Sequence, residues 1–286
     1  MATHDLATKY SKKVDEAFQR GALANLVTNN DYDWDGVQTV KVYSIPVVEL
    51  TNYTRSGSNR YGTPDELGNS TQVMTVSKDR AWTFTIDKGN KMQSQMVMDA
   101  GKAVARQLAL KVIPEFDTHV FKAIATAASG YTDANSKAHA SATTITKSNA
   151  YAEFLSAQEV LGNCNVPDEG RVCICSYAFA GFLKQDAAFM RDCDTAQNMQ
   201  IKGTLGEVDG TKLIRVPASR LPAGCDFILT HPMATVAPKV LSEYKIHTDA
   251  PGVSGWLCEG RIIYDAFVLN NKRDATFYHG AALAGG

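Results

Sequence analysis

Alternating apolar and polar residues predict two β-strands on either side of a long polar tract. Residues 37–50 alternate in this way, and in residues 72–87 the side chains of Trp82, Phe84 and Ile86 share one face. Turn residues fill the tract between them. We therefore expect a long hairpin with arms of about 15 residues, reaching roughly 50 Å. Because an isolated two-stranded ribbon is marginal in water, we expect it to rest on another copy of the chain.

Helical spacing of apolar residues occurs before and after this ribbon. Residues 5–26 form an amphipathic pattern, which predicts a short N-terminal helix. Residues 91–128 keep three-and-four spacing, which predicts a single helix about 55 Å long. Pro114 lies inside this helix and lacks a backbone donor, so we expect a kink or a division there. Residues 129–149 read as a linker of small residues near a domain boundary.

The second half of the chain alternates between strand and helix patterns and is predicted to be an α/β domain. Asp209 and Gly210 mark a hairpin turn. The expected elements are a helix in 150–167, a strand in 171–176, a helix in 177–190, a strand in 212–216, a strand followed by a helix in 225–241, and three strands in 255–279.

Composition indicates an ordinary folded protein with a sizeable core. The chain has 286 residues, 44% of them hydrophobic, and a net charge of −1, so binding of nucleic acid by counterion release is not indicated. No secretory leader pattern opens the sequence. The longest apolar run, residues 172–183, is shorter than the roughly 20 residues that span a bilayer. Six scattered cysteines favour a reduced cytosolic setting.

The sequence contains few arrangements that carry chemistry. Cys173 and Cys175 form a C-x-C pair, but no zinc spacing surrounds them, so they read as small buried residues of a strand. The six histidines stand apart, and His231, before Pro232, reads as a turn residue. We predict no catalytic, cofactor or metal site. The alternative from another class is a cytosolic α/β enzyme that uses Cys173 or His231.

Charged residues follow the predicted ribbon. The basic ones allow two interpretations: a soluble edge protected by charge, or salt bridges to a neighbouring subunit. The carboxylates at the tip should be solvated and unsuited to acid–base catalysis. The candidate inter-subunit contacts are Arg55, Arg60, Asp65, Glu66, Lys78, Arg80 and Lys88.

The order of these parts resembles a known family. The most specific stretches are "NRYGTPDELGN", "FTIDKGNKMQSQMVMDAGKAVARQLALKVIPEFD", "GEVDGTKLIRVPASRLP" and "GRIIYDAFVLNNKRDATFYH". Across nearly the whole chain the sequence resembles the tailed-bacteriophage major capsid proteins with the Hong Kong 97 fold. The resemblance implies an α+β fold with an N-terminal arm (1–36), a peripheral-domain strand (37–49), an extended β-hairpin loop (50–88), a peripheral-domain spine helix and linker (89–145), an α/β axial domain (146–250) and peripheral-domain C-terminal strands (251–286).

What the resemblance implies is a shell subunit and not an enzyme. Pentamers and hexamers of the chain would form an icosahedral capsid around double-stranded DNA, assembled in the host bacterial cytoplasm and retained in the virion. Scaffolding, portal and decoration proteins are candidate partners, DNA would be contacted non-specifically, and no membrane is involved. Some relatives join subunits by a lysine–asparagine bond, for which Lys78 or Lys88 and Asn270 or Asn271 are candidates. No scaffold-like domain precedes the fold, so we expect a separate scaffolding protein or none. The nearest alternative is an encapsulin-like compartment shell.

Overall fold

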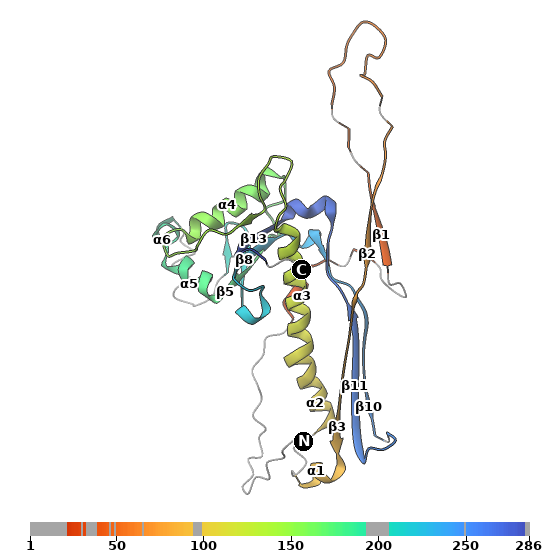
Figure 1. Ribbon diagram of the computed structural model, residues 1–286. Coiled ribbons are helices and arrows are strands. Elements are labelled where there is room, and N and C mark those ends of the chain that lie inside the picture. The colour runs from red at the N-terminus through yellow and green to blue at the C-terminus, as the bar shows by residue number, and fades with distance from the viewer. Residues whose placement is uncertain are drawn as a thin grey trace.

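A computed structural model describes residues 22–29, 31–32, 39–45, 47–48, 50–64, 66–93, 99–192, 206–248 and 250–283. The chain forms an elongated molecule in which a lateral body of sheet and helices joins a long helix and a long sheet (Figure 1). Most of the helix predicted in residues 5–26 lies outside the described residues. Its described end contains a short 3-10 turn, η1 (Ala24–Leu26).

The body is built on a six-stranded mixed sheet with the order β4-β13-β8-β5-β7-β6. The strands are β4 (Ala140–Ser141), β5 (Val172–Ser176), β6 (Glu207–Val208), β7 (Thr211–Val216), β8 (Cys225–Thr230) and β13 (Thr276–Gly280). Asp209 and Gly210 both have positive φ, 49° and 70°, which makes the β6–β7 turn that the sequence predicted.

Helices cover both faces of this sheet, so its central strands are buried on both sides. On β5, Val172 and Ile174 face the core that contains helix α3 (Ile113–Ala128). Cys173 and Cys175 face the core beneath α4 (Ala150–Asn163) and α5 (Tyr177–Gln185). This explains the nearly continuous apolar run of β5. The predicted helix over 177–190 is divided at Asp186 into α5 and α6 (Ala187–Asp192).

A long helix passes along the body and beyond it. It consists of α2 (Ala100–Gln107), a π-helical turn η2 (Leu108–Val112) and α3 (Ile113–Ala128), with helical dihedral angles at the junctions. Its start differs from the prediction, because Asp99 is extended and caps α2, which leaves α1 (Lys88–Gln93) as a separate short helix.

Of the two outcomes expected at Pro114, a kink or a division, the division is wrong. Pro114 occupies the first turn of α3, directly after the π-helical turn. There the backbone N–H of Ile113 bonds to the carbonyl of Leu108, five residues earlier. The wider turn accommodates the missing proline donor, so the helix continues from Ala100 to Ala128.

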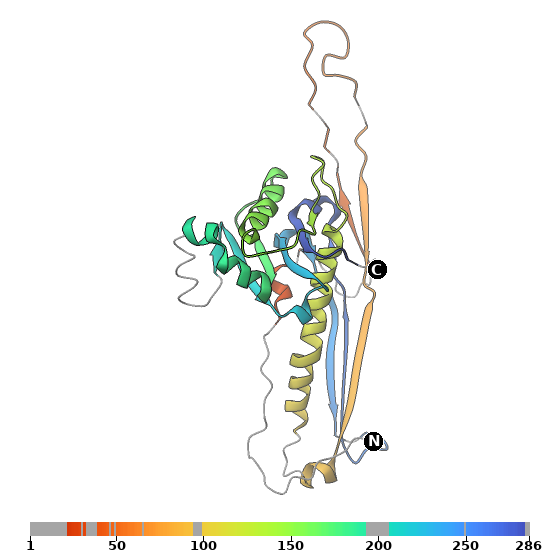
Figure 2. The same cartoon turned by 60° about the vertical axis from the view of Figure 1, so that its left-hand side comes forward.

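A three-stranded antiparallel sheet lies beside the lower part of this helix (Figures 1 and 2). Its order is β10 (Lys239–His247), β11 (Gly255–Tyr264) and β3 (Lys78–Asp87). Gly260 sits opposite Trp82, and the indole ring lies over its backbone where a Cβ atom would clash, so glycine makes room for the ring.

The predicted hairpin is confirmed only at its base. β1 (Thr39–Ser44) pairs antiparallel with β2 (Ser70–Thr75) over six residue pairs. The strand predicted over 72–87 is divided, and its second part, β3, pairs with β11 and packs against α2 instead of extending the ribbon. The arms are shorter than predicted because β3 buries its apolar face within its own chain. The described residues between Ser44 and Ser70 form the projecting loop (Figure 2).

Two strands belong to sheets formed mainly by other parts of the chain, and the predicted domain boundaries stay predictions. β10, inside the predicted axial segment 146–250, belongs to the sheet of β3 and β11, whereas β13, inside 251–286, belongs to the six-stranded sheet. The helix predicted after β8 is absent from the described residues 225–241, which instead contain η4 (Pro232–Ala234), β9 (Thr235–Val236) and the start of β10. The remaining elements are η3 (Ala218–Arg220), β12 (Phe267–Val268) and η5 (Asn270–Ala275).

Candidate assembly surface

The projecting loop and its base carry a concentration of exposed apolar side chains. Leu50 is fully exposed at 100%, Val47 at 92% and Ile45 at 70%. Scattered surface apolar residues are normal, but nine of the fifteen large exposed apolar residues that the structure describes fall within residues 43–73. We name this set the apolar loop set: Tyr43, Ile45, Val47, Val48, Leu50, Tyr53, Tyr61, Leu67 and Val73. Apolar groups gathered in this way mark an interaction surface.

The tip of the loop folds back on itself through local contacts. The backbone N–H of Thr54 donates to the carbonyl of Arg60 at 3.0 Å, and the hydroxyl of Thr51 donates to the carbonyl of Tyr61 at 3.0 Å. The rings of Tyr53 and Tyr61 pack edge to face, with centroids 5.0 Å apart. A tip with these contacts loses less conformational entropy on binding than an open coil would.

The base of the loop is attached firmly to the body at the turn between β2 and β3. Asp265 accepts hydrogen bonds from the backbone and hydroxyl of Ser77, both at 2.8 Å, and contacts the ring of His119 on α3 at 2.7 Å. Burial alone would raise the pKa of Asp265, but the hydrogen bonds from His119, Ala266 and Ser77 outweigh it and lower the pKa to about 2. This carboxylate therefore holds the loop base to the long helix.

A second buried carboxylate attaches the segment that follows the N-terminal region. Asp117, on α3, is fully buried and accepts backbone hydrogen bonds from Leu23 and Ala24. It also pairs with Arg220 at 2.7 Å. These bonds attach the chain to α3 at η1. Sequence reasoning missed both Asp117 and Asp265, because neither lies in a motif and their partners are distant in sequence.

The predicted charged contacts are spread over several parts of the chain and do not form one site. Arg55 and Glu66 are exposed in the loop, and Arg60 donates to the carbonyl of Gly57 at 3.2 Å. Asp65 lies outside the described residues. A role of these four residues at a subunit contact stays a prediction.

On β3 the predicted contact residue Arg80 has a partner within its own chain, as does its neighbour Asp79, which pairs with Arg261. Nε of Arg80 lies 2.7 Å from Oε1 of Glu115 on α3. Lys78 is exposed on the same edge strand, and Lys88 is exposed at the start of α1. Their roles at a subunit contact, and the lysine–asparagine bond with Asn270 or Asn271 of η5, stay predictions.

Cys173 and His231, the two residues of the enzyme alternative, lie in surroundings typical of residues that stabilise the fold. Cys173 is fully buried in the sheet, and burial raises the pKa of its thiol well above the usual range. His231 caps η4: its Nδ1 accepts from the backbone N–H of Met233, and its Nε2 lies 3.1 Å from the carbonyl of Glu169. This agrees with a turn histidine and a buried strand cysteine. These two residues give the enzyme alternative no support.

Over the part of the chain that the structure describes, no helix is both long and apolar enough to cross a bilayer.

No family model matches the sequence, and no curated protein matches it. Solved structures match it over almost its whole length. A structure from Mycobacterium phage Che8 has a TM-score of 0.73 at 16% identity, covering 97% of this chain and 98% of that one. The capsid structure of Cyanophage P-SCSP1u has a TM-score of 0.76 at 14% identity, covering 97% and 93% of the two chains.

The mature capsid of bacteriophage PhiM1 gives a TM-score of 0.72 at 14% identity, covering 96% of this chain and 91% of that one. At such low identities the similarity establishes the fold. The chain therefore has the mixed helix-and-sheet fold of phage capsid structures, as the sequence resemblance predicted.

Proposed function

We propose that this chain is the major capsid protein of a tailed phage and self-assembles into an icosahedral shell. The observation that carries the proposal is the apolar loop set, displayed on a projecting loop of a chain with the phage-capsid fold. A lone subunit would expose these side chains to water. A second copy, presenting a surface to receive the loop, would remove them from it.

The shape of the molecule supports a subunit with several neighbours. The loop extends one way from the body, and the long helix with its three-stranded sheet extends the other way (Figure 1). Each end can engage a different subunit, and several modest contacts per subunit together hold a shell. In this proposal pentamers and hexamers form around the closed symmetry positions, with the peripheral and axial divisions that the sequence resemblance implies.

The same proposal assigns the further partners. Packaged double-stranded DNA would lie against the shell without tight binding, which agrees with a net charge of −1. A portal and scaffolding or decoration proteins would complete the particle, which would be assembled in the host cytoplasm, and the role is structural, not enzymatic. The matching structures that are named as capsids come from phages, which favours this function over an encapsulin-like compartment.

Assembly can be tested by expressing the chain alone and together with the genes that flank its own, followed by sedimentation and electron microscopy. The proposal predicts megadalton closed particles in at least one of the two preparations. Flanking genes for a portal and a terminase are also expected. A stable monomer or small oligomer in both preparations would contradict the proposal, and a cargo enzyme inside the particles would support the compartment alternative.

A further inference from the structure

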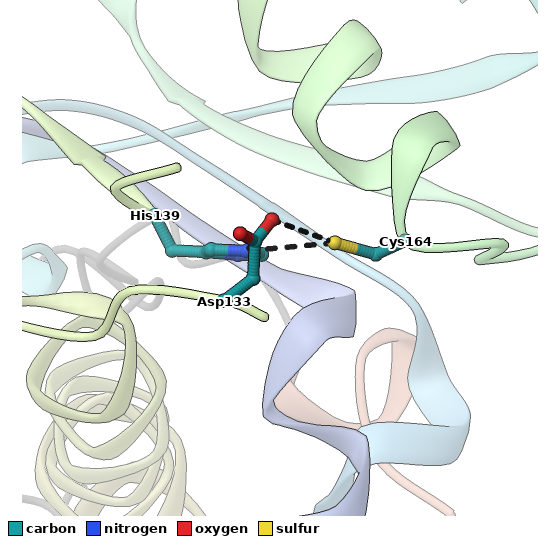
Figure 3. A group of neighbouring side chains, drawn as sticks. All are labelled: Asp133, His139 and Cys164. Atoms are coloured by element: carbon teal, nitrogen blue, oxygen red, sulfur yellow. Dashed lines mark hydrogen bonds and ion pairs between the residues drawn. The ribbon is translucent and has the colours of Figure 1, made fainter. Parts of the chain in front are cut away.

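Three side chains with different metal-binding atoms lie together where the long helix joins the body. After α3 ends at Ala128, the chain turns back toward β4, and this turn carries Asp133 and His139. Cys164 lies at the C-terminal end of α4. Figure 3 shows the carboxylate, the imidazole and the thiol pointing toward one another from these two segments.

The distances between the three ligand atoms fit a small cation. Sγ of Cys164 lies 2.9 Å from Oδ2 of Asp133 and 3.9 Å from Nε2 of His139, and that nitrogen lies 3.5 Å from Oδ2. A tetrahedral zinc ion, with bonds of about 2.3 Å to sulfur and about 2.0–2.1 Å to nitrogen or oxygen, separates its ligand atoms by roughly 3.3–3.6 Å. The nitrogen–oxygen distance of 3.5 Å lies within this range, the sulfur–oxygen distance of 2.9 Å below it and the sulfur–nitrogen distance of 3.9 Å above it, so sub-ångström side-chain adjustments would admit the ion.

Hydrogen bonds outside the cluster orient two of the ligands. Nδ1 of His139 lies 2.8 Å from the carbonyl oxygen of Thr276. A carbonyl only accepts, so Nδ1 carries the hydrogen and Nε2 presents its lone pair to the cluster. Oδ1 of Asp133 accepts from the backbone N–H groups of Asn135 at 2.8 Å and Lys137 at 2.9 Å, which leaves Oδ2 facing the cysteine and the histidine.

Burial and ligand type narrow the class of ion. His139 is fully buried and Asp133 nearly so, whereas Cys164 is half-buried, so the cluster lies near the protein surface. A sulfur, a nitrogen and an oxygen donor together suit a borderline-soft cation such as Zn²⁺, since Mg²⁺ and Ca²⁺ take oxygen ligands. We propose that Asp133, His139 and Cys164 bind one divalent ion of the zinc class, with water as the fourth ligand.

This site departs from the sequence-based prediction of no metal site. The ligands are separated by 6 and 25 positions in the chain, a spacing that matches no zinc motif, and only the fold brings them together. Binding replaces the S–H bond of Cys164 with a sulfur–metal bond and releases the proton to water. A bound ion would join the segment after α3 to the end of α4, so it would connect the long helix to the body.

X-ray absorption of the unmodified chain loaded with Zn²⁺ tests the site without any mutation. We expect one equivalent of zinc with one sulfur at about 2.3 Å and lighter ligands at about 2.0–2.1 Å. A shell of only nitrogen and oxygen, or no retained zinc after gel filtration, would overturn the proposal.

Two variants then assign the ligands. Cys164→Ser keeps a hydroxyl donor toward Asp133, and His139→Asn keeps a donor toward Thr276 while removing Nε2. Each should weaken Zn²⁺ binding in calorimetry by more than ~100-fold, beyond the ~10–100-fold that loss of an outer hydrogen-bond partner costs. Cys258→Ala is the matched control, because that thiol packs with Ile86 and Val104 in a different core cluster.

The expected result is wild-type affinity in the control and lost affinity in both variants, with unchanged circular dichroism. Wild-type affinity in folded Cys164→Ser or His139→Asn would refute the assignment. If a variant fails to fold, the X-ray absorption spectrum of the unmodified chain still shows whether zinc binds with one sulfur ligand. None of these measurements depends on shell assembly.

Discussion

Replacing two side chains of the apolar loop set with asparagine should weaken assembly without changing the stability of the subunit. Val47 and Leu50 are 92% and 100% exposed, and neither is needed for the core of its own chain. Surface substitutions of this kind change the free energy of unfolding by less than about 0.5 kcal/mol. If a neighbour covers both side chains, each contributes about 1.5–3 kcal/mol to the contact.

The double variant Val47→Asn/Leu50→Asn should therefore lose at least about 3 kcal/mol per loop contact. Since each 1.4 kcal/mol is about a factor of ten, the subunit concentration at which half of the protein assembles should rise by ~100-fold or more. Light scattering across a concentration series measures this quantity, and urea unfolding of unassembled protein measures subunit stability.

Ser56→Asn/Ser58→Asn is the matched control, because it makes the same number of asparagine substitutions at exposed polar positions of the same loop. The control should assemble as the wild type does. Unchanged assembly of the Val47→Asn/Leu50→Asn variant would refute the reasoning that a neighbour covers the loop. A large fall in its unfolding free energy would show that these side chains stabilise their own subunit.

Three further substitutions test the contacts that position the loop and the long helix. Asp117→Ala removes a buried ion pair with Arg220 together with the acceptor of the Leu23 and Ala24 backbone N–H groups, and should cost about 3–5 kcal/mol in urea unfolding. A loss below about 1 kcal/mol would mean that Asp117 does not anchor η1. Asp265→Asn should cost about 2–3 kcal/mol at pH 7, because a carboxylate with a lowered pKa stabilises the fold above its unfolded pKa and loses that contribution as the pH falls through its folded pKa. The difference from wild type in urea midpoints should therefore shrink between about pH 4 and 2, and a pH-independent difference would contradict the assigned role. Gly260→Ala puts a Cβ atom onto the indole of Trp82 and should lower the melting temperature, and a melting temperature equal to that of the wild type would show that the ring moves aside without cost.

The parts of the fold that depend on local pattern could be predicted from the sequence. The alternation of Trp82, Phe84 and Ile86 correctly gave a strand with one apolar face, and Asp209 and Gly210 correctly marked a turn. The sequence pattern did not predict which strands pair with one another. Alternation shows which face is apolar but not which surface covers it, and β3 proved to cover its apolar face with its own long helix.

Local backbone geometry and strand pairing explain the other differences. The interruption at Asp99 and the π-helical turn before Pro114 depend on local backbone geometry that apolar spacing does not report. β10 is mostly exposed and is held in its sheet by antiparallel pairing with β11.

The sequence predicted the projecting segment but not the exposed apolar side chains on it. The polar tract predicted this segment, and only charged residues were predicted as its contacts. The exposed aliphatic residues Ile45, Val47 and Leu50 were read as part of a strand, because a strand pattern and an exposed apolar run look alike until burial is known. Asp133, His139 and Cys164 had no sequence signal at all.

The central claim is that residues 45–69 complete their contacts on a second copy of the chain. Cryo-electron microscopy of the assembled protein tests it most directly. The account predicts closed shells in which Val47 and Leu50 of each subunit are covered by an adjacent subunit. Density showing the loop laid against its own body, or left in solvent with no neighbour near it, would contradict the account.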